Sequence, residues 1–238
     1  MKYFKTSSLM VLLAFALSGC AGNDPQDPFE GYNRAMFSFN DGVDRAVLQP
    51  VAKGYKAITP SFFRGHVSNF FSNLGDIWGT ANAGFQFKGE KFLTGVFRVG
   101  VNSTFGIGGL VDVAGPLGLD SPQEDFGQTL GYWGIKPGPY IVLPIFGPSN
   151  VRDTIGMIAD GFAGVSYFVD ENSVRWGLLA LDGINLRAQL LSVEGAVDGA
   201  ALDKYTFFKN AYMQRRLNMV YDGDPPVEPG FEIDDADL

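Results

Sequence analysis

Histidine and cysteine are almost absent from this sequence, which contains one of each among 238 residues. Because His66 is the only histidine, the usual nucleophile–base triads and histidine-based metal sites are excluded. His66 lies beside Val67 in a stretch with helical periodicity, so a structural or interfacial role is expected for it. Because Cys20 is the only cysteine, no disulfide can form within the chain, and packing alone must stabilise the fold.

Long apolar runs and an excess of basic residues are missing as well. After residue 19, no charge-free apolar stretch reaches the ~18 residues that a membrane-spanning helix needs. The chain has 18 basic and 26 acidic residues, so nucleic acid is not an expected partner. What is abundant is phenylalanine (21) and glycine (31), a mixture that suits a tight aromatic core. The same mixture suits a helical bundle in a bilayer, where small residues let helices approach, and a protein sunk into one leaflet fits the pattern too.

No motif supports catalysis. The glycines at 106–109 lack the lysine-serine pair or third spaced glycine of a phosphate-binding loop, and they predict a helix-ending turn instead. Glu124–Asp125, and Asp153 with Asp160, offer carboxylates for acid–base chemistry or a divalent ion. However, Asp153 and Asp160 share one helical face beside Arg152, which favours an ion-pair network or a polar stripe. Neither an enzyme activity nor a cofactor or metal is expected.

The first 20 residues have the layout of a secretory signal. Lys2 and Lys5 precede an apolar run at 9–17, which ends in Leu-Ser-Gly-Cys at 17–20. This ending resembles the lipobox of bacterial lipoproteins, in which the signal is cut before the cysteine and the cysteine carries three acyl chains. Ala21 follows where inner-membrane lipoproteins usually have aspartate, so the resemblance implies the outer membrane, on its periplasmic face. An ordinary secreted protein or a short membrane anchor is the alternative, but the run is short for an anchor.

These features divide the chain into four segments. We expect a signal peptide at 1–19, a lipidated tether at 20–26 and one helical domain at 27–221. Residues 222–238 contain seven acidic residues, no basic residue and three prolines, which predicts a disordered acidic tail. No fixed-period repeat is present, and no linker splits the domain.

Apolar residues at helical spacing dominate that domain. Asp27 and Glu30 bracket Pro28 in the pattern of a capping box, which predicts a helix start. The helix is expected to end or kink at Gln49–Pro50. Further helices are predicted at 51–58, 60–81, 88–102, 151–162, 174–193 and 203–220. Residues 116–147 are rich in proline and glycine and predict a loop, with short strands at 129–133 and 140–143. The fold class is therefore mostly α.

Several segments, in order from residue 27 to residue 216, match the motifs of one family. They resemble the MlaA/VacJ outer-membrane lipoproteins at 27–37, 50–55, 68–74, 102–110, 124–131, 138–144, 147–153, 187–191 and 211–216. The resemblance implies a single compact, ring-like bundle of amphipathic helices with a central polar channel. It also implies a position in the periplasmic leaflet of the outer membrane.

The resemblance further implies a function and partners. Such lipoproteins remove mislocalised phospholipids from the outer leaflet and pass them through the channel to a periplasmic lipid-binding carrier, which maintains lipid asymmetry. Trimeric porins are their membrane partners. An alternative of another class is a porin-bound structural adaptor that moves no lipid. A phospholipid-degrading enzyme would need a nucleophile and a base, and the sequence offers neither.

A path for phospholipid needs polar groups beside apolar surface. The polar channel candidates are Arg152, Asp153, Arg175 and Arg187, because an arginine can bind a phosphate with two hydrogen bonds. Each arginine could instead pair with an acid or extend to water. The loop at 134–147 is the candidate gate, since it combines glycine hinges, prolines and an apolar tip; the alternative is a hairpin that only packs. Its residues of interest are Gly134, Pro137, Gly138, Tyr140, Leu143, Pro144, Phe146 and Gly147.

Phe39 and Asn40 form a candidate control region in the first helix. They precede Gly42, which costs a helix ~1 kcal/mol relative to alanine. Either the helix kinks there or close packing compensates. A small shift at Phe39–Asn40 would move the whole amino-terminal helix.

Overall fold

The computed structural model describes residues 24–163, 169–192 and 202–226. The signal sequence and Cys20 therefore lie outside the described residues. The helices are α2 (Glu30–Val43), α3 (Gln49–Ile58), α4 (Ser61–Phe85), α5 (Gly89–Thr104), α6 (Phe126–Tyr132), α7 (Val151–Ala163), α9 (Asn172–Leu190) and α11 (Lys204–Val220). A π-helix η1 (Asp44–Leu48) joins α2 to α3, and a short 3-10 helix η2 covers Gly115–Leu117. The strands are β1 (Tyr140–Leu143) and β2 (Gly147–Asn150). The predicted, mostly helical fold class is confirmed.

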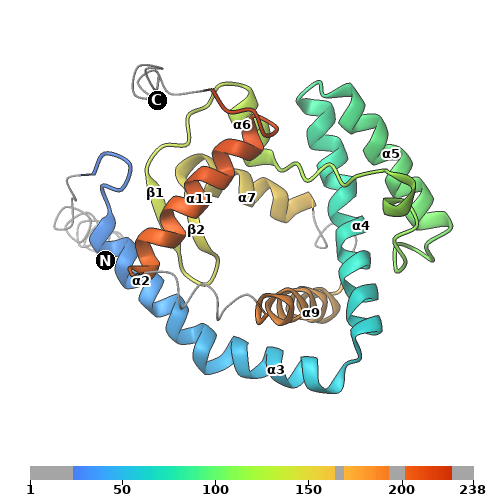
Figure 1. Ribbon diagram of the computed structural model, residues 1–238, viewed down its shortest axis with the longest axis horizontal. Coiled ribbons are helices and arrows are strands. Elements are labelled where there is room, and N and C mark those ends of the chain that lie inside the picture. The colour runs from blue at the N-terminus through green and yellow to red at the C-terminus, as the bar shows by residue number, and fades with distance from the viewer. Residues whose placement is uncertain (1–23, 164–168, 193–201, 227–238) are drawn as a thin grey trace, which may run out of the picture.

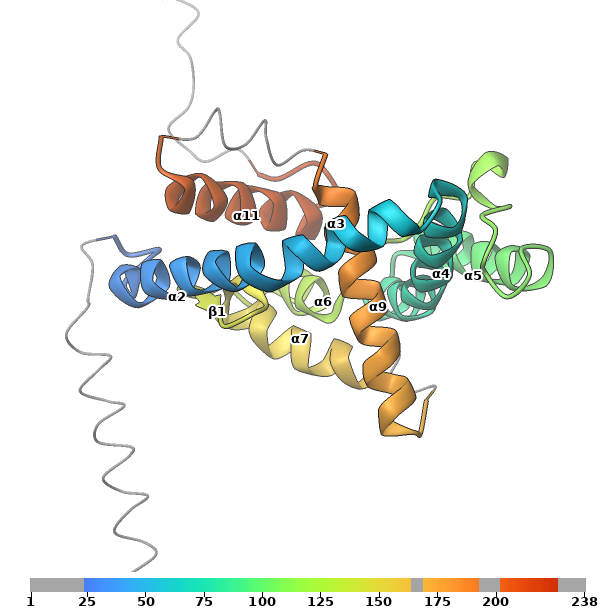
Figure 2. The same ribbon diagram turned by 90° about the horizontal axis from the view of Figure 1, so that it is seen from below.

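The helices follow one another around a ring (Figure 1). Helices α2, α3 and α4 run along its outer edge, and α6 and α11 close the opposite side. Inside this outline, α9 packs on α3 and α4, and α7 packs on α6. Seen at right angles, α11 and α7 lie on opposite sides of α2 (Figure 2).

The first long helix does not end at Pro50: α2, η1 and α3 follow one another without a break, and α3 runs in a different direction from α2 (Figure 1). Proline has no N–H and its ring crowds the preceding turn, so an α-helix ordinarily breaks there. Here the wider π-helical turn of η1 lies immediately before Gln49–Pro50 and accommodates the proline within the helix. Gly42 has open space around its Cα, so close packing does not explain it. The irregularity follows Gly42 by two residues.

The predicted capping box at Asp27–Glu30 is wrong. Helix α2 begins at Glu30 after Phe29, and no side chain caps it. The Asp27 carboxylate is instead buried and accepts hydrogen bonds from Asn33 Nδ2 (2.8 Å) and from the Tyr205 hydroxyl. The Asp27 carboxylate that the local pattern predicted to cap α2 therefore bonds to α11 instead.

The β1–β2 hairpin is held by α2 in place of a third strand. Asn33 Nδ2 donates to the Tyr140 carbonyl and Asn33 Oδ1 accepts from the Val142 N–H, at 3.1 and 2.8 Å. Asn40 repeats this with the Leu143 carbonyl and the Ile145 N–H, at 2.9 and 2.7 Å. Seven residues of helix and three of strand both advance about 10 Å, so the two asparagines match the strand's spacing. The side-chain amides thus satisfy the open edge of β1.

One predicted strand is confirmed and one is wrong. Residues 140–143 form β1, which pairs antiparallel with β2 from Tyr140↔Asn150 to Leu143↔Gly147. Residues 129–133 instead lie in and just after α6, whose start is capped by Asp125 accepting from the Gln128 N–H. β2 has the sequence Gly-Pro-Ser-Asn, which has low strand propensity, so pairing with β1 defines it.

The interior is unusually polar. Tyr140, Val142 and Tyr205 form a small apolar cluster. The other fully buried large side chains are mainly amides, hydroxyls and one carboxylate: Gln86, Gln128, Asn33, Asn82, Asn150, Asn185, Thr129, Asp27 and Ser149. Buried polar groups are stable only when hydrogen-bonded, so side-chain bonds between helices carry much of the cohesion here.

The start of the predicted acidic tail belongs to the folded body. Asp222 accepts from Lys88 and Lys91 of the α4–α5 region, at 2.8 and 2.5 Å. The same lysines bind Glu124, whose side chain is buried. The expected boundary at residue 222 is therefore too early, and residues 227–238 lie outside the described part.

Helices α6 and α7 approach so closely at Gly127 and Gly156 that no side chain fits between them. A Cβ at Gly156 would lie 2.4 Å from the Gly127 nitrogen and 2.7 Å from its Cα. Gly156→Ala should therefore destabilise the fold by about 1–3 kcal/mol, since backbone rather than a flexible side chain must move.

Chemical denaturation of the two alanine variants checks this. Gly161→Ala, on the same helix with open space around it, is the control and should gain up to ~1 kcal/mol from helix propensity. Equal midpoints for the two variants would contradict the packing argument.

Candidate functional site

An open cavity of about 1280 Å³ lies inside the ring, lined mainly by α4, α7, α9 and the tip of the β1–β2 hairpin. Most of its wall is apolar, and the larger apolar side chains are Phe71, Leu74, Trp78, Leu143, Phe146, Met157, Ile158, Phe162, Trp176 and Leu179. Ordinary small-molecule sites enclose roughly 300–1,000 Å³, so this one is large.

A few charged side chains lie within that apolar wall. Asp160 of α7 accepts from Trp78 Nε1 (2.6 Å) and from the Phe126 N–H (2.9 Å). Asp182 of α9 has no hydrogen-bond or ion-pair partner in the described part of the chain. Burial raises the pKa of both carboxyls above the usual aspartate value. Arg175, two turns before Asp182, donates to the carbonyls of residues 169 and 170 and to Asn172.

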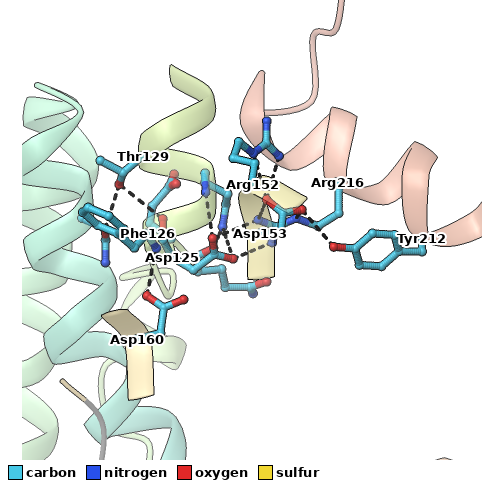
Figure 3. A network of polar contacts seen from close by, with 12 residues as sticks. Asp125, Phe126, Thr129, Arg152, Asp153, Asp160, Tyr212 and Arg216 are labelled. Atoms are coloured by element: carbon cyan, nitrogen blue, oxygen red, sulfur yellow. Dashed lines mark hydrogen bonds and ion pairs between the residues drawn. The ribbon is translucent and has the colours of Figure 1, made fainter. Parts of the chain in front are cut away.

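Behind the cavity, Arg216 of α11 binds two carboxylates at once (Figure 3). Its guanidinium contacts Asp125 at 2.5 and 2.9 Å and Asp153 at 2.8 and 3.0 Å. Asp153 also accepts from the Tyr212 hydroxyl (2.9 Å) and from Asn150 Nδ2 (2.6 Å). One cation thus joins the residue before α6, the first turn of α7 and α11.

Electrostatics confirm that this network is an ion-pair cluster. Burial acts to raise the pKa of Asp153 and of Asp125, but the charge and hydrogen bonds of Arg216 outweigh it and the pKa of each is lowered. The same carboxylates raise the pKa of Arg216 against its burial. All three groups are therefore charged at neutral pH. The predicted ion-pair network of Asp153, Asp160 and Arg152 is confirmed for Asp153 and Arg152, with Arg152 Nε 2.9 Å from Asp153 Oδ1, whereas Asp160 forms no ion pair with the described residues.

The four polar channel candidates lie in different places. Arg175 lines the large cavity. Arg152 and Asp153 are buried in the Arg216 network, and Arg152 also lines a second cavity of about 670 Å³ between α6 and α11. Arg187 pairs with Asp44 of η1 at 2.7 and 2.8 Å, which ties α9 to the π-helix.

The candidate gate loop is divided between the two cavities. Leu143, Pro144 and Phe146 line the large one, whereas Gly134 and Pro137 line the smaller one. Tyr140 is fully buried in the apolar cluster. Gly138 and Gly147 adopt φ of 69° and 82°, which favours glycine just before β1 and at the start of β2, where the hairpin turns back.

The structure also places the predicted control region, the single histidine and the glycine-rich turn. Asn40 holds the hairpin tip, as described above, and its neighbour Phe39 is half-exposed. His66 contacts the Leu110 carbonyl through Nδ1 (2.8 Å) and Phe62 through its ring, as expected for a structural histidine. The turn at 106–109 does end α5. Within the described ranges, no helix is long and apolar enough to cross a membrane, and no cluster of metal-ligating side chains is found.

Sequence reasoning missed Arg216 and Asp182. Arg216 ends the motif at 211–216, but its partners lie 91 and 63 residues away along the chain. Asp182 resembles any surface acid of a helix, and its place in the cavity wall depends on how α9 packs on α3 and α4.

Replacing Arg216 tests the network. Arg216→Met leaves Asp125 without a cation and leaves Asp153 with Arg152 alone, so it should destabilise the folded protein by about 3–5 kcal/mol at pH 7, measured by denaturant unfolding in detergent. Because the pKa of each carboxyl is depressed in the folded wild type, its stabilisation is present at neutral pH and is lost as pH falls. The difference should therefore shrink as the pH approaches the ordinary aspartate pKa of about 3.9.

Arg215→Met is the matched control. Arg215 is the adjacent residue, is exposed and makes no ion pair with any other described residue. A similar loss of stability in both variants would show that Arg216 has no special role.

Comparison with known proteins places the chain in a family. The family model described as "MlaA lipoprotein" matches residues 25–219. The "Intermembrane phospholipid transport system lipoprotein MlaA" of Escherichia coli strain K12 is 35% identical, with 97% of this chain and 96% of that protein covered. The protein of the same name from Haemophilus influenzae is 32% identical, with 92% of each chain covered.

A solved structure agrees with these sequence matches. It is described by the words "Structural basis for maintenance of bacterial outer membrane lipid asymmetry" and is 36% identical, with a TM-score of 0.72. The match covers 82% of this chain and 98% of that one. The resemblance inferred from the motifs is thus confirmed: the chain belongs to the MlaA lipoprotein family.

Proposed function

We propose that this protein is a non-enzymatic phospholipid transporter of the outer membrane, which takes mislocalised phospholipids from the outer leaflet and passes them through its central cavity to a periplasmic carrier. The observation that carries the proposal is the mixed wall of the large cavity. A phospholipid has a charged headgroup and apolar chains, and this wall offers Arg175, Asp160 and Asp182 among aromatic and aliphatic side chains. The names of the MlaA relatives support the same direction.

The outer surface supports a position in the periplasmic leaflet. Large apolar side chains are strongly exposed around α3, α4 and α5: Ile58, Phe62, Phe63, Phe87, Phe97, Phe105 and Ile107 are all more than half exposed. Contiguous exposed apolar surface marks membrane or protein contacts. An acylated Cys20 would add ~0.8 kcal/mol per buried methylene and hold the body at the bilayer.

The partners are part of the same proposal. The E. coli relative is named as a component of an intermembrane transport system, which supports a periplasmic lipid-binding carrier as the acceptor. A trimeric porin is the proposed membrane partner, on the family resemblance and on the exposed apolar residues of α5, such as Leu93 and Phe97. The remaining alternative is an adaptor that binds the porin without moving lipid.

Obstructing the cavity separates the two functions. Gly75 lies on α4, lines the cavity and has open space at its Cα. Gly75→Trp should fill the passage and cause phospholipid to accumulate in the outer leaflet of cells with no other copy, to the level of a deletion, as measured by labelling of surface-exposed phospholipid.

Gly65→Trp is the control, because Gly65 lies ten residues earlier on α4, also in open space but away from the cavity. It should behave as wild type. An adaptor without transport would tolerate both substitutions, and that outcome would overturn the proposed function.

Asn40 is proposed as the residue that holds the gate. Asn40→Ala removes both hydrogen bonds to the hairpin tip, so the tip that contributes Leu143 and Phe146 to the cavity should open more often. Two lost bonds correspond to about 1–3 kcal/mol of local stability, and hydrogen exchange at the Ile145 amide should accelerate about tenfold or more.

Asn40→Asp is the informative partner variant. It keeps an acceptor for the Ile145 N–H and loses only the donor to the Leu143 carbonyl. Its Ile145 amide should exchange at a rate between wild type and Asn40→Ala. Unchanged exchange in Asn40→Ala would show that Asn40 does not control the tip.

A further inference from the structure

Some of the charged side chains that line the large cavity have a counter-ion and others have none among the described residues. Five charged side chains line it. Glu124 is neutralised by Lys88 and Lys91 at 3.0 and 2.6 Å, and Asp125 is neutralised by Arg216. These two carboxylates therefore contribute little net charge to the cavity.

Three charges remain without a counter-ion in the described part of the chain. Arg175 donates only to backbone carbonyls and to the neutral Asn172, so its positive charge is not cancelled. Asp160 accepts two hydrogen bonds from neutral donors, both at Oδ1, which leaves Oδ2 open. Asp182 accepts none. The wall thus presents one cation and two anions among apolar side chains.

The positive and negative charges lie at different positions along α9. Arg175 and Asp182 both belong to α9 and are separated by seven residues, about 10.5 Å along the helix and nearly on one face. Asp160 lies on α7, which faces the same cavity. A ligand that satisfied all three groups would carry an anion toward one end of α9 and a cation toward the other.

We infer that the cavity selects phospholipids with a zwitterionic headgroup, whose phosphate binds Arg175 and whose ammonium binds Asp182 and Asp160. This rests on the proposed function, namely that phospholipid occupies the cavity. A headgroup with a phosphate and no ammonium would add a third anion to the two carboxylates and supply no cation to offset them. A primary ammonium instead supplies the N–H donors that Asp182 and Asp160 Oδ2 lack.

The test uses the full chain purified in detergent and incubated with equimolar phosphatidylethanolamine and phosphatidylglycerol of identical acyl chains. Retained lipid is measured by mass spectrometry, and the amount retained by Gly75→Trp is subtracted as lipid bound outside the cavity. Wild type should retain about tenfold more phosphatidylethanolamine, the ratio expected from one charge-assisted hydrogen bond. Asp182→Asn should bring the ratio close to one.

Two further variants keep the result interpretable. Asp160→Asn retains a carboxamide oxygen for Trp78 and Phe126 while removing the charge, and it should also lower the ratio. Asp120→Asn makes the same charge change at an exposed residue outside the cavity and should leave the ratio at the wild-type value.

The failures of the two proposals are distinguishable. Equal retention of both lipids by wild type, or a ratio unchanged by Asp182→Asn and Asp160→Asn, would overturn the headgroup inference and leave the transport proposal standing. No retention of either lipid above the Gly75→Trp background would overturn both.

Discussion

The shared guanidinium of Arg216 is the interaction on which the closed ring depends. Helix α11 is the last element of the chain, and Arg216 joins it to Asp125 before α6 and to Asp153 in α7. Breaking a buried pair leaves an uncompensated charge, which costs more than the pair itself contributes. If α11 moved away, Asp125 would lose its cation and Asp153 would keep only Arg152, so this contact favours the closed ring.

This contact belongs to a wider pattern that is the reverse of an ordinary water-soluble protein. Amides and carboxylates fill the interior, and aromatic side chains cover much of the surface. Asn33 and Asn40 hold β1, Gln86 bonds Glu124 and Thr129, and Arg98 bonds Asp76. In water, exposing Phe87 and Phe105 to this degree would be unfavourable. The proposed leaflet location accounts for both halves of the pattern, because helices surrounded by lipid lose the hydrophobic drive to associate and need packing and hydrogen bonds instead.

The sequence predicted what local periodicity encodes. The helices from Ser61 to Thr104 and from Val151 to Val220 follow from apolar spacing, because a period of about 3.6 residues indicates a helix whether its apolar face meets the interior or the surface. The errors fall where a distant partner decides. Asp27 is bonded to Tyr205 rather than to its own helix, and β2 exists only because β1 and α7 flank it. Arg216 and Asp182 could not be distinguished from ordinary helical charges, since their roles depend on residues that are far away in the chain.

The network and the cavity share a wall, which links stability to lipid chemistry. Asp125 lies in both, and the next residue, Phe126, donates its N–H to Asp160 at 2.9 Å. Arg216 thus neutralises a carboxylate that would otherwise add a third anion to the cavity. Because α11 contributes no residue to the cavity lining, a displacement of α11 would make the cavity more negative without any change in the lining residues. The same cation that closes the ring therefore sets the charge that a passing headgroup meets.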